Sequence, residues 1–557
     1  MKKTLSIIIL MLLLPIGVMA TFQIPSDRSI TWTGNAGVNG GIPIRTTICQ
    51  TITASSGDRT AEIQTAINNC PSGQVVLLGA GTFNISGLQM KTDVTLRGSG
   101  MGSTIIVPSG SEFIHFGAYG VDYGTAVGLS SGLTKGSTSI TTSGNHGWNV
   151  GDCIVIDQLN NAAGDPPVTN VGEGGSMTMS GRTGDGTRAI QQVVKLVAPT
   201  SGTTATLEIP LYWTMDGTKT PQAAKVTMQV TNAGIEDLTF NSSYFYNVTI
   251  FNADNCWLKG VELNGFSESG MGIYLTNAYR IQIEKCNFHQ VVAGTANDNY
   301  AITSAMTGSA HLIQNNTIHN VSCGVVIQGG FSGGVIAYNY LTNIWQEVYP
   351  TANRYAIGLH GGHQFQNLFE GNVIEGALFS SDNYWGSNSN NTLFRNRIHM
   401  DYTKVDQLVT LGVSNNQTYY NVIGNYLGTA GQDDAYETTT IPYAPSSKYI
   451  YFTPSGACKT TMLRHGNWDA VTAGQKWCDS SGEPGCQGAT VDHSLPDSLY
   501  YDSKPAFFGS IAWPPINPET PFVADIPAKV YYDTGSWPDT GGDDTTPPNV
   551  PSGLSVE

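Results

Sequence analysis

The sequence is poor in charged residues, and most of those it has are acidic. Asp, Glu, Lys and Arg make up 12% of the 557 residues, and the formal net charge is −16. This balance excludes nucleic-acid binding through a broad basic surface, because such a surface needs clustered Lys and Arg. A polyanionic sugar stays compatible as a partner if the basic groups that bind it are local.

Long apolar runs are scarce as well, and the only one lies near the N-terminus. It covers residues 5–18, follows Lys2 and Lys3, and ends at the small-residue sequence Val18-Met19-Ala20. This order is typical of a secretory signal peptide, and the run is shorter than the about 20 residues that span a bilayer. We therefore predict a signal peptide at residues 1–20 and a mature chain without a membrane span. The protein is then secreted by a bacterium or held on its surface.

Cysteine motifs for metal binding are absent. The nine cysteines form no CxxC pair and no Cys/His cluster with zinc spacing. Export permits disulfides, and closeness in the chain pairs Cys49 with Cys70 and Cys478 with Cys486. Cys286 falls at an apolar repeat position, which predicts a buried thiol.

A six-residue repeat is the strongest signal in the sequence. In each unit, the first and sixth residues are apolar, and the fourth is the central residue. The last five central residues are all asparagine, namely Asn316, Asn339, Asn372, Asn396 and Asn425. Alternate side chains of a strand point the same way, so the central and final residues share one interior.

Stacking one such unit per coil, about 4.8 Å apart, predicts internal apolar columns and an internal amide ladder. A second short strand recurs between the units, for example at residues 272–275 and 324–327. The intervals between units vary, which indicates one connecting loop of variable length. The sequence therefore predicts an all-β parallel β-helix, and the abundant glycine (65 residues) fits its many turns.

The segments 60–67, 73–78, 81–87 and 94–100 resemble the start of pectate-lyase-like β-helix proteins. The similarity covers roughly residues 40–120 and 225–430 and implies a right-handed, single-stranded β-helix. It also implies a short capping helix, and residues 61–67 have apolar side chains at helical spacing. The superfamily contains lyases, hydrolases, epimerases, esterases, phage tailspikes and adhesins, so the resemblance implies a fold rather than a reaction.

Breaks in the repeat predict the domain organisation. The expected segments are the signal peptide (1–20), an N-terminal cap with the first coils (21–124), a small β insertion (125–215), the main coils (216–440), an irregular C-terminal cover (441–532), and a linker leading into the start of a fibronectin type III-like module (533–557).

The resemblance also implies where a substrate lies, on the sheet that carries residues 272–275 and its equivalents. Lyase chemistry on a uronic acid needs a cation that neutralises the carboxylate and a base that removes the adjacent proton. Arg354 or Lys404 is predicted to neutralise the substrate carboxylate. His360 or Lys404 is predicted to act as the base that removes the proton. The further predicted substrate contacts are Tyr274, Tyr300, Gln328, Glu347, Tyr355 and His363.

A calcium ion is a possible cofactor, because Asp298, Glu347 and Asp401 on the variable loops offer carboxylate oxygens. A second polar column follows the Asn-bearing strands and could also form an acid–base cluster. It consists of His289, His319, Glu375, Arg397 and His399.

Hydrolase motifs are mostly missing. The polygalacturonase branch carries Asn-Thr-Asp, Asp-Asp, Gly-His-Gly and Arg-Ile-Lys, and the first and last are absent here. Asp433-Asp434 lies in the tail of the coil region, and residues 359–363 read Leu-His-Gly-Gly-His. Hydrolysis by paired carboxylates therefore lacks its expected signature.

The sequence thus favours a secreted lyase or epimerase that acts on an acidic polysaccharide. Two alternatives stay open. One is a non-catalytic carbohydrate-binding or adhesion β-helix on the cell surface, and the other is a glycoside hydrolase.

Overall fold

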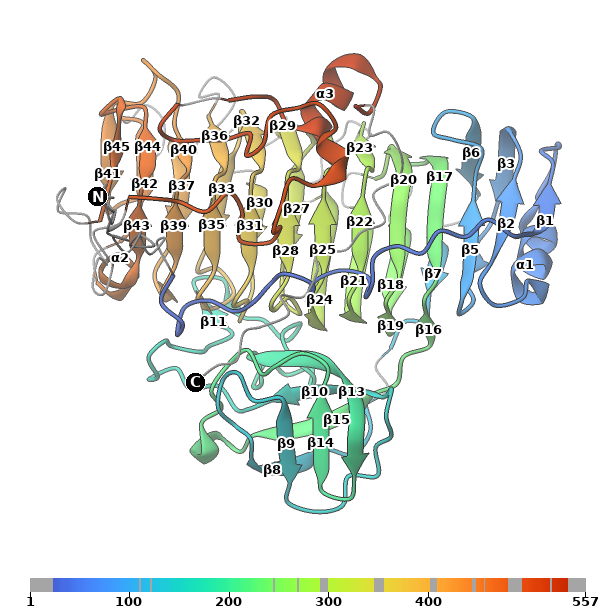
Figure 1. Ribbon diagram of the computed structural model, residues 1–557, viewed down its shortest axis with the longest axis horizontal. Coiled ribbons are helices and arrows are strands. Elements are labelled where there is room, and N and C mark those ends of the chain that lie inside the picture. The colour runs from blue at the N-terminus through green and yellow to red at the C-terminus, as the bar shows by residue number, and fades with distance from the viewer. Residues whose placement is uncertain are drawn as a thin grey trace, which may run out of the picture.

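The repeat folds into a stack of coils with a small barrel attached to one side (Figure 1). Each coil adds one parallel strand to each neighbouring ladder. The computed structural model describes residues 24–109, 112–120, 123–243, 246–267, 270–290, 299–344, 355–400, 408–442, 447–454, 456–478, 493–520 and 523–538. The signal peptide and the fibronectin-like end expected from the sequence lie outside these residues.

Two rows of strands form the larger sheet, called sheet A here. The first row runs β1 (Ile48–Ile52), β2 (Gln74–Leu78), β5 (Val94–Arg97), β17 (Gly234–Asn241), β20 (Trp257–Asn264), β22 (Gln282–Glu284), β25 (Leu312–Gln314), β28 (Val335–Ala337), β31 (Leu368–Glu370), β35 (Thr392–Phe394), β39 (Asn421–Ile423) and β43 (Leu463–His465). The second row runs β3 (Gly81–Ile85), β6 (Thr104–Pro108), β17, β20, β23 (Asn287–His289), β26 (Thr317–Val321), β29 (Tyr340–Ile344), β32 (Val373–Glu375), β36 (Arg397–His399), β40 (Tyr426–Leu427), β44 (Asn467–Asp469) and β45 (Gly474–Lys476).

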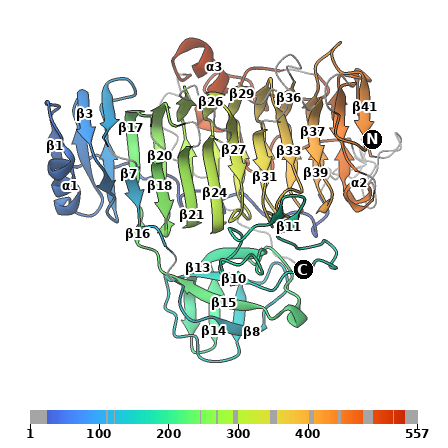
Figure 2. The same cartoon turned by 180° about the vertical axis from the view of Figure 1, so that it is seen from behind.

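The opposite wall of the coils is sheet B. It faces the viewer in Figure 2, where the molecule is turned by 180° from Figure 1. Its strands are β4 (Leu88–Gln89), β7 (Glu112–Phe116), β18 (Tyr246–Phe251), β21 (Met271–Tyr279), β24 (Tyr300–Ser309), β27 (Cys323–Ile327), β30 (Tyr355–Leu359), β33 (Leu378–Ser381), β37 (Val409–Val413), β42 (Tyr449–Phe452) and β41 (Ala435–Thr438). Short pairs at its margin are β16 (Val230–Thr231) with β19 (Ala253–Asp254) and β34 (Asn388–Ser389) with β38 (Gln417–Thr418).

A closed barrel is inserted between β7 and β16. It consists of β8 (Val127–Ser131), β9 (Ser139–Thr142), β10 (Cys153–Asp157), β13 (Gln191–Ser201), β14 (Thr204–Leu207) and β15 (Gln222–Val226). A hairpin, β11 (Val171–Gly172) and β12 (Gly175–Ser176), extends from it. The barrel docks on the coils through backbone and hydroxyl contacts: the Val193 N–H donates to Ser309 Oγ at 2.9 Å, and Ser332 Oγ donates to the Gln191 carbonyl at 3.1 Å.

The Asn ladder stands at the bend between the two rows of sheet A. Each Nδ2 donates to the Oδ1 of the next coil, at 2.9 Å from Asn316 to Asn339, 3.0 Å from Asn339 to Asn372 and 2.9 Å from Asn372 to Asn396. The ladder continues through Asn425 to Asn467. Each amide also accepts a backbone N–H of the preceding coil, so the bend repeats identically from coil to coil.

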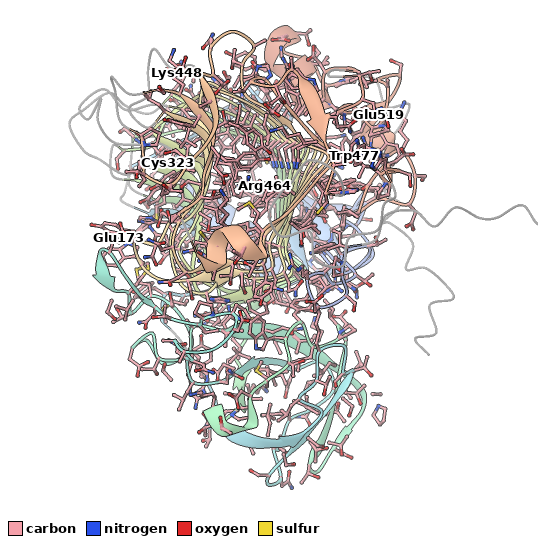
Figure 3. All side chains as sticks on the ribbon, turned by 90° about the vertical axis from the view of Figure 1, so that its left-hand side faces the viewer. Glu173, Cys323, Lys448, Arg464, Trp477 and Glu519 are labelled. Atoms are coloured by element: carbon pink, nitrogen blue, oxygen red, sulfur yellow. A yellow bond between two sulfur atoms is a disulfide. The ribbon has the colours of Figure 1, made fainter. Side chains whose placement is uncertain are left out.

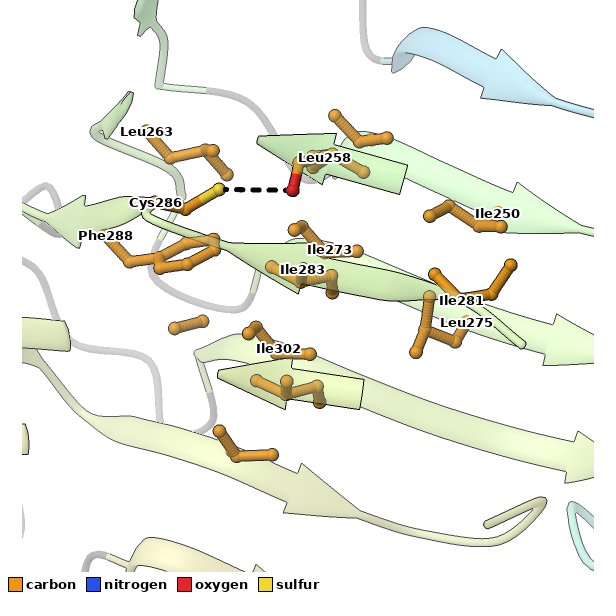
Figure 4. Packing of buried hydrophobic residues seen from close by; sticks show 14 of the residues in the cluster. Ile250, Leu258, Leu263, Ile273, Leu275, Ile281, Ile283, Cys286, Phe288 and Ile302 are labelled. Carbon is orange, nitrogen blue, oxygen red and sulfur yellow. Dashed lines mark hydrogen bonds between the residues drawn. The ribbon is translucent and has the colours of Figure 1, made fainter. Parts of the chain in front are cut away.

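Apolar columns fill the space between the sheets, as Figure 4 shows for Ile250 and Ile273 of sheet B facing Leu258 and Ile283 of sheet A. Cys286 lies in the same core as a buried thiol, which confirms its predicted state, and its Sγ contacts the Leu258 carbonyl oxygen at 3.8 Å. The coils therefore cohere through both a continuous apolar core and polar groups that bond only to the next coil.

The first coil is closed by helix α1 (Thr60–Asn69), whose Ile63, Ala66 and Ile67 are buried on the core. The Cys49–Cys70 disulfide predicted from the sequence is present beside it. Cys478 is also disulfide-bonded, while its expected partner Cys486 lies outside the described residues. Short helices α2 (Ala457–Thr461), η1 (Gly217–Lys219), η2 (Ala506–Phe508) and α3 (Pro527–Thr534) complete the structure.

The N-terminal segment and residues 493–516 lie along the outer face of the first row, whereas helix α3 packs on β26 of the second row. Trp32 Nε1 donates to the Gln366 carbonyl at 2.7 Å, and Phe508 is fully buried against the coils. Tyr500 OH donates to the Ala36 carbonyl at 3.0 Å, which joins the two segments. This cover occupies the first-row face, so sheet B and the second row retain outward faces that a ligand could reach.

The predicted fold class is confirmed: the chain is an all-β right-handed parallel β-helix with a capping helix and a small β insertion. The parallel coils extend to β44, beyond the boundary expected at residue 440, and β45 pairs antiparallel with β44. The barrel strands run from Val127 to Val226. Among the described residues, no helix is both long and apolar enough to cross a bilayer.

Removing one rung of the ladder should destabilise the whole stack. Asn372→Ala removes the acceptor of the Asn339 backbone and side-chain N–H groups, and it removes the side-chain donor to Asn396 Oδ1, which keeps only the backbone N–H of residue 372. We expect the free energy of unfolding to fall by roughly 2–4 kcal/mol, measured by urea denaturation. The exposed Asn145→Ala is the matched control, and an equal, small effect of both changes would refute the structural role of the ladder.

Acid should weaken the fold through His311. Burial lowers the pKa of this imidazole from 6.5 to about 3, and its Nδ1 accepts the Ile281 N–H at 3.2 Å. Below pH 6.5 the unfolded chain binds a proton that the folded chain does not, so stability is lost as the pH falls toward 3. Thermal melting of His311→Asn, which keeps an acceptor, should show a shallower loss between pH 7 and pH 5 than the parent protein.

Candidate functional site

The candidate site lies where successive strands of sheet B end. Ile327, Leu359 and Ser381 are paired across β27, β30 and β33. The residues that follow them, Gln328, His360 and Asp382, are therefore brought to the same end of neighbouring coils. This register explains why residues distant in the sequence become neighbours here.

His360 and Asp382 form the polar centre of the site. His360 Nδ1 lies 2.6 Å from Asp382 Oδ2, and the two side chains are 17% and 15% exposed. The second carboxylate oxygen, Oδ1, accepts the Tyr384 N–H at 2.9 Å. A carboxylate at Nδ1 orients the ring and makes Nε2 its basic nitrogen, which is the arrangement of a general base held by an orienting acid.

Aromatic rings surround this pair. The Tyr384 ring stacks on His360 with centroids 5.4 Å apart, and Trp385 approaches the same imidazole edge-on at 6.4 Å. Tyr355, the first residue of β30, lies 6.0 Å from the imidazole. Tyr384 is 47% exposed, so it offers a flat apolar surface beside polar groups. Such a mixture suits a ligand with both apolar faces and hydroxyl groups.

The hairpin β11–β12 forms one wall of the site. The Glu173 N–H donates to the Asn383 carbonyl at 2.9 Å, and the Gly174 N–H donates to the Tyr384 carbonyl at 2.7 Å. A Cβ on Gly172 would lie 1.9 Å from the Asn383 carbonyl oxygen, a main-chain atom, so only glycine permits this approach. Figure 3, viewed along the coil stack, shows Glu173 on the same side as Cys323 of sheet B. We call the surface formed by Gln328, Tyr355, His360, Asp382, Tyr384, Trp385 and this hairpin the sheet B groove.

Three predicted substrate contacts lie beneath the surface instead. Tyr274 is 5% exposed and packs with Phe251 and Ala305, and Tyr300 packs against Cys323 and Val326. His363 is 2% exposed, and both of its ring nitrogens lie 2.9 Å from serine hydroxyls, those of Ser387 and Ser389. Burial lowers the pKa of His363 to about 3. The structure therefore corrects the role expected for His363, which supports the coil interior.

The other predicted residues divide into two groups. His360 and Tyr355 come together in the groove, and Gln328 borders it on the neighbouring coil but is only 9% exposed. Arg354, Lys404, Asp298, Glu347 and Asp401 all lie outside the described residues. Within the residues that the structure does describe, no cluster of three or more His, Cys, Asp or Glu side chains is placed to hold a metal ion.

The second polar column lies on the outward face of the second row of sheet A. His289 Nε2 lies 2.9 Å from Glu262 Oε1, and the His289 and His319 rings stack at 5.0 Å. Tyr532 of helix α3 packs on the His319 ring at 5.0 Å. Figure 1 shows α3 above this part of the coils. A helix across the column makes it less suited to a long ligand than the sheet B groove.

Sequence reasoning missed Glu173, Asp382, Tyr384 and Trp385 as parts of the site. The position of Asp382 in the sequence could have indicated its place in the site. Asp382 directly follows a strand of sheet B, as His360 does. Aligning the ends of these strands, rather than their apolar cores, would have paired the two. Glu173 carried no such signal, because its position depends on how the inserted barrel docks on the coils.

Comparisons with known proteins bear on the fold. No family model and no curated protein matches the chain. Among solved structures, the tailspike protein gp49 of Pseudomonas phage LKA1 is similar with a TM-score of 0.50 and 13% identity, over 73% of this chain and 72% of that one.

Two further solved structures have lower TM-scores with this chain. A polygalacturonase from Erwinia carotovora ssp. carotovora has a TM-score of 0.31 and 12% identity, over 77% of this chain and 92% of that one. PfbA, a surface adhesin of Streptococcus pneumoniae, has a TM-score of 0.37 and 13% identity, over 77% and 92%. The likeness to the tailspike protein, at 13% identity, bears on the fold alone.

Proposed function

We propose that the sheet B groove binds an acidic polysaccharide and that the protein is a lyase or epimerase that acts on it. The observation that supports this most is the His360–Asp382 pair beside an exposed aromatic ring. A base oriented by a carboxylate serves proton abstraction, and the rings of Tyr384 and Trp385 serve the apolar faces of sugar units. The reaction class rests on this pair and on the predicted roles of Arg354 and Lys404.

The proposed chemistry begins at the carbon next to the sugar carboxylate. Neutralisation of this carboxylate, the role predicted for Arg354 or Lys404, makes the adjacent proton acidic, and a Ca²⁺ ion held by Asp298, Glu347 and Asp401 would supply the same neutralisation. His360 takes this proton while Asp382 stabilises the imidazolium. In a lyase, the electron pair forms a carbon–carbon double bond and the glycosidic oxygen leaves with a proton. In an epimerase, a proton returns to the opposite face of the same carbon.

The main rival is a binding or adhesion surface without catalysis. The same rings and polar groups would hold a glycan, and His360 would only donate or accept a hydrogen bond. A screen separates these functions: the purified protein is incubated with polygalacturonate, alginate and glycosaminoglycans, with and without Ca²⁺ or a chelator. Ultraviolet absorbance from unsaturated uronate together with new reducing ends supports a lyase. New reducing ends alone indicate a hydrolase, and proton exchange from solvent without cleavage indicates an epimerase.

Removing the base should abolish turnover while leaving the fold intact. We expect His360→Gln to lower kcat by about 100-fold or more, and Asp382→Asn by at least about tenfold, because the second change removes the negative charge that stabilises the imidazolium but leaves the base in place. Initial rates on the cleaved polysaccharide measure both. His289→Gln is the matched control, since His289 pairs with Glu262 on the other face. Full activity of His360→Gln would exclude His360 as the base.

Removing the exposed ring should instead weaken binding. Tyr384→Ala loses a stacking surface worth about 1 kcal/mol, so we expect KM to rise roughly fivefold with little change in kcat. Tyr532→Ala on helix α3 is the control, because Tyr532 is 41% exposed on the opposite side of the coils. If both variants keep the parent KM, the polymer does not lie over Tyr384.

A further inference from the structure

A second recess lies where the barrel, the coils and the N-terminal segment meet. It is a cleft of about 740 Å³, lined by residues 26–35 of the N-terminal segment, residues 209–214 of the barrel and a corner of the coils. This volume falls within the usual range of small-ligand sites. None of the side chains of the sheet B groove lines it. We call it the junction cleft.

The coil corner contributes three side chains at regular intervals. Gln366, Asn390 and Tyr419 occupy equivalent turns, with φ of 59°, 53° and 57°. The Gln366 N–H donates to the Asn390 carbonyl, and the Asn390 N–H donates to the Thr418 carbonyl, both at 3.1 Å. Because the left-handed turn repeats from coil to coil, these side chains line the cleft at about the 4.8 Å spacing of the strands.

Three buried polar atoms among the lining residues have no hydrogen-bond partner within the described part of the chain. They are Gln366 Oε1, Asn390 Oδ1 and Tyr212 OH. The side chains of Gln366, Asn390 and Tyr212 are only 1%, 6% and 2% exposed. Asn390 Nδ2 already donates to the Asp27 carbonyl at 3.1 Å, which fixes the amide and leaves its oxygen as an acceptor. Unpaired buried polar atoms are unfavourable, and because neighbouring atoms cover these three, a ligand that supplies donors would pair with them as the lining side chains shift.

Aromatic rings lie next to these acceptors. Trp213 lines the cleft and is held edge-to-face by Phe365 at 5.5 Å and His363 at 6.0 Å. Tyr419 OH donates to Asp165 Oδ2 at 2.8 Å, and the Arg28 guanidinium lies 5.1 Å from the Tyr419 ring centroid. The rings are thus fixed before any ligand arrives, which lowers the entropic cost of binding.

The charges around the cleft disfavour an anion. Asp27 and Asp165 both line it. Its lysine, Lys135, donates from Nζ to the Ser26 carbonyl at 2.7 Å and to the Asp27 carbonyl at 3.1 Å, so its hydrogen bonds are directed at the protein backbone. A ligand with hydroxyl donors, apolar faces and no charge fits this combination of acceptors, rings and carboxylates.

We infer that the junction cleft is a second carbohydrate site, which binds a neutral oligosaccharide of a few sugar units. The site is distinct from the sheet B groove in its position, its lining residues and the charge of the ligand it suits. It assigns the inserted barrel a role in binding, since Tyr212 and Trp213 belong to the barrel and Gln366, Asn390 and Tyr419 to the coils. The inference does not depend on the reaction proposed for His360.

Calorimetric titration of the purified protein tests the inference. Cellotetraose, xylotetraose, mannotetraose and maltotetraose serve as neutral probes, and trigalacturonate as the anionic one. We expect at least one neutral probe to bind, and its binding to persist in His360→Gln and Tyr384→Ala. Binding of none of the four at millimolar concentration would overturn the inference, and so would loss of neutral-probe binding in Tyr384→Ala.

Two variants locate the site. Asn390→Gly removes the acceptor at a backbone position that glycine adopts freely, and Trp213→Ala removes the ring. Each should weaken binding of the neutral probe by about tenfold, while Asn390→Gly, which also loses the hydrogen bond to the Asp27 carbonyl, still unfolds in one cooperative thermal transition. Asn315→Gly is the matched control, because Asn315 also has a positive φ (51°) and an unpaired buried carbonyl oxygen but lies outside the cleft. Unchanged affinity in Asn390→Gly and Trp213→Ala would refute the assignment.

Discussion

The structure depends on the repetition of one bend, held from coil to coil by the buried asparagine ladder. Each amide donates to the next amide and accepts a backbone N–H, so its hydrogen bonds are satisfied only if the neighbouring coil has the same conformation. Apolar side chains alone would tolerate a shift of one strand along another, whereas a ladder of amides does not. The register fixed in this way also aligns the strand ends of sheet B. His360 and Asp382 therefore lie side by side because the asparagine ladder, on the other side of the coil, fixes the register of the strands.

The solenoid itself was predictable because its signals are periodic. Central asparagines and flanking apolar residues recur within each unit, and this local pattern is what stacking requires. Asn467 was missed because the preceding segment changes length, although the structure shows that it continues the ladder. The Cys49–Cys70 disulfide was predicted from closeness in the chain alone.

The site was predicted only in part, because it depends on contacts that no local pattern encodes. His360 was singled out correctly as a residue of this surface, but Tyr274 and His363 are covered by their neighbours. Whether an outward side chain stays exposed depends on which distant segments lie over it. Met179 of the loop that leads away from the barrel hairpin packs near Tyr274, and Trp213 of the barrel contacts His363. The position of an inserted domain cannot be deduced from the period of the coils.

The hairpin β11–β12 is attached to the coils by main-chain groups of Glu173 and Gly174, which bond to main-chain carbonyls of Asn383 and Tyr384. Attachment of this kind is indifferent to the identity of most side chains. Mutation at Val171, Glu173 or Ser176 would thus alter the wall of the groove without detaching it, while Gly172 must stay glycine to clear the Asn383 carbonyl. The surface of this wall could therefore change through a few hairpin positions while the coils beneath stay unchanged.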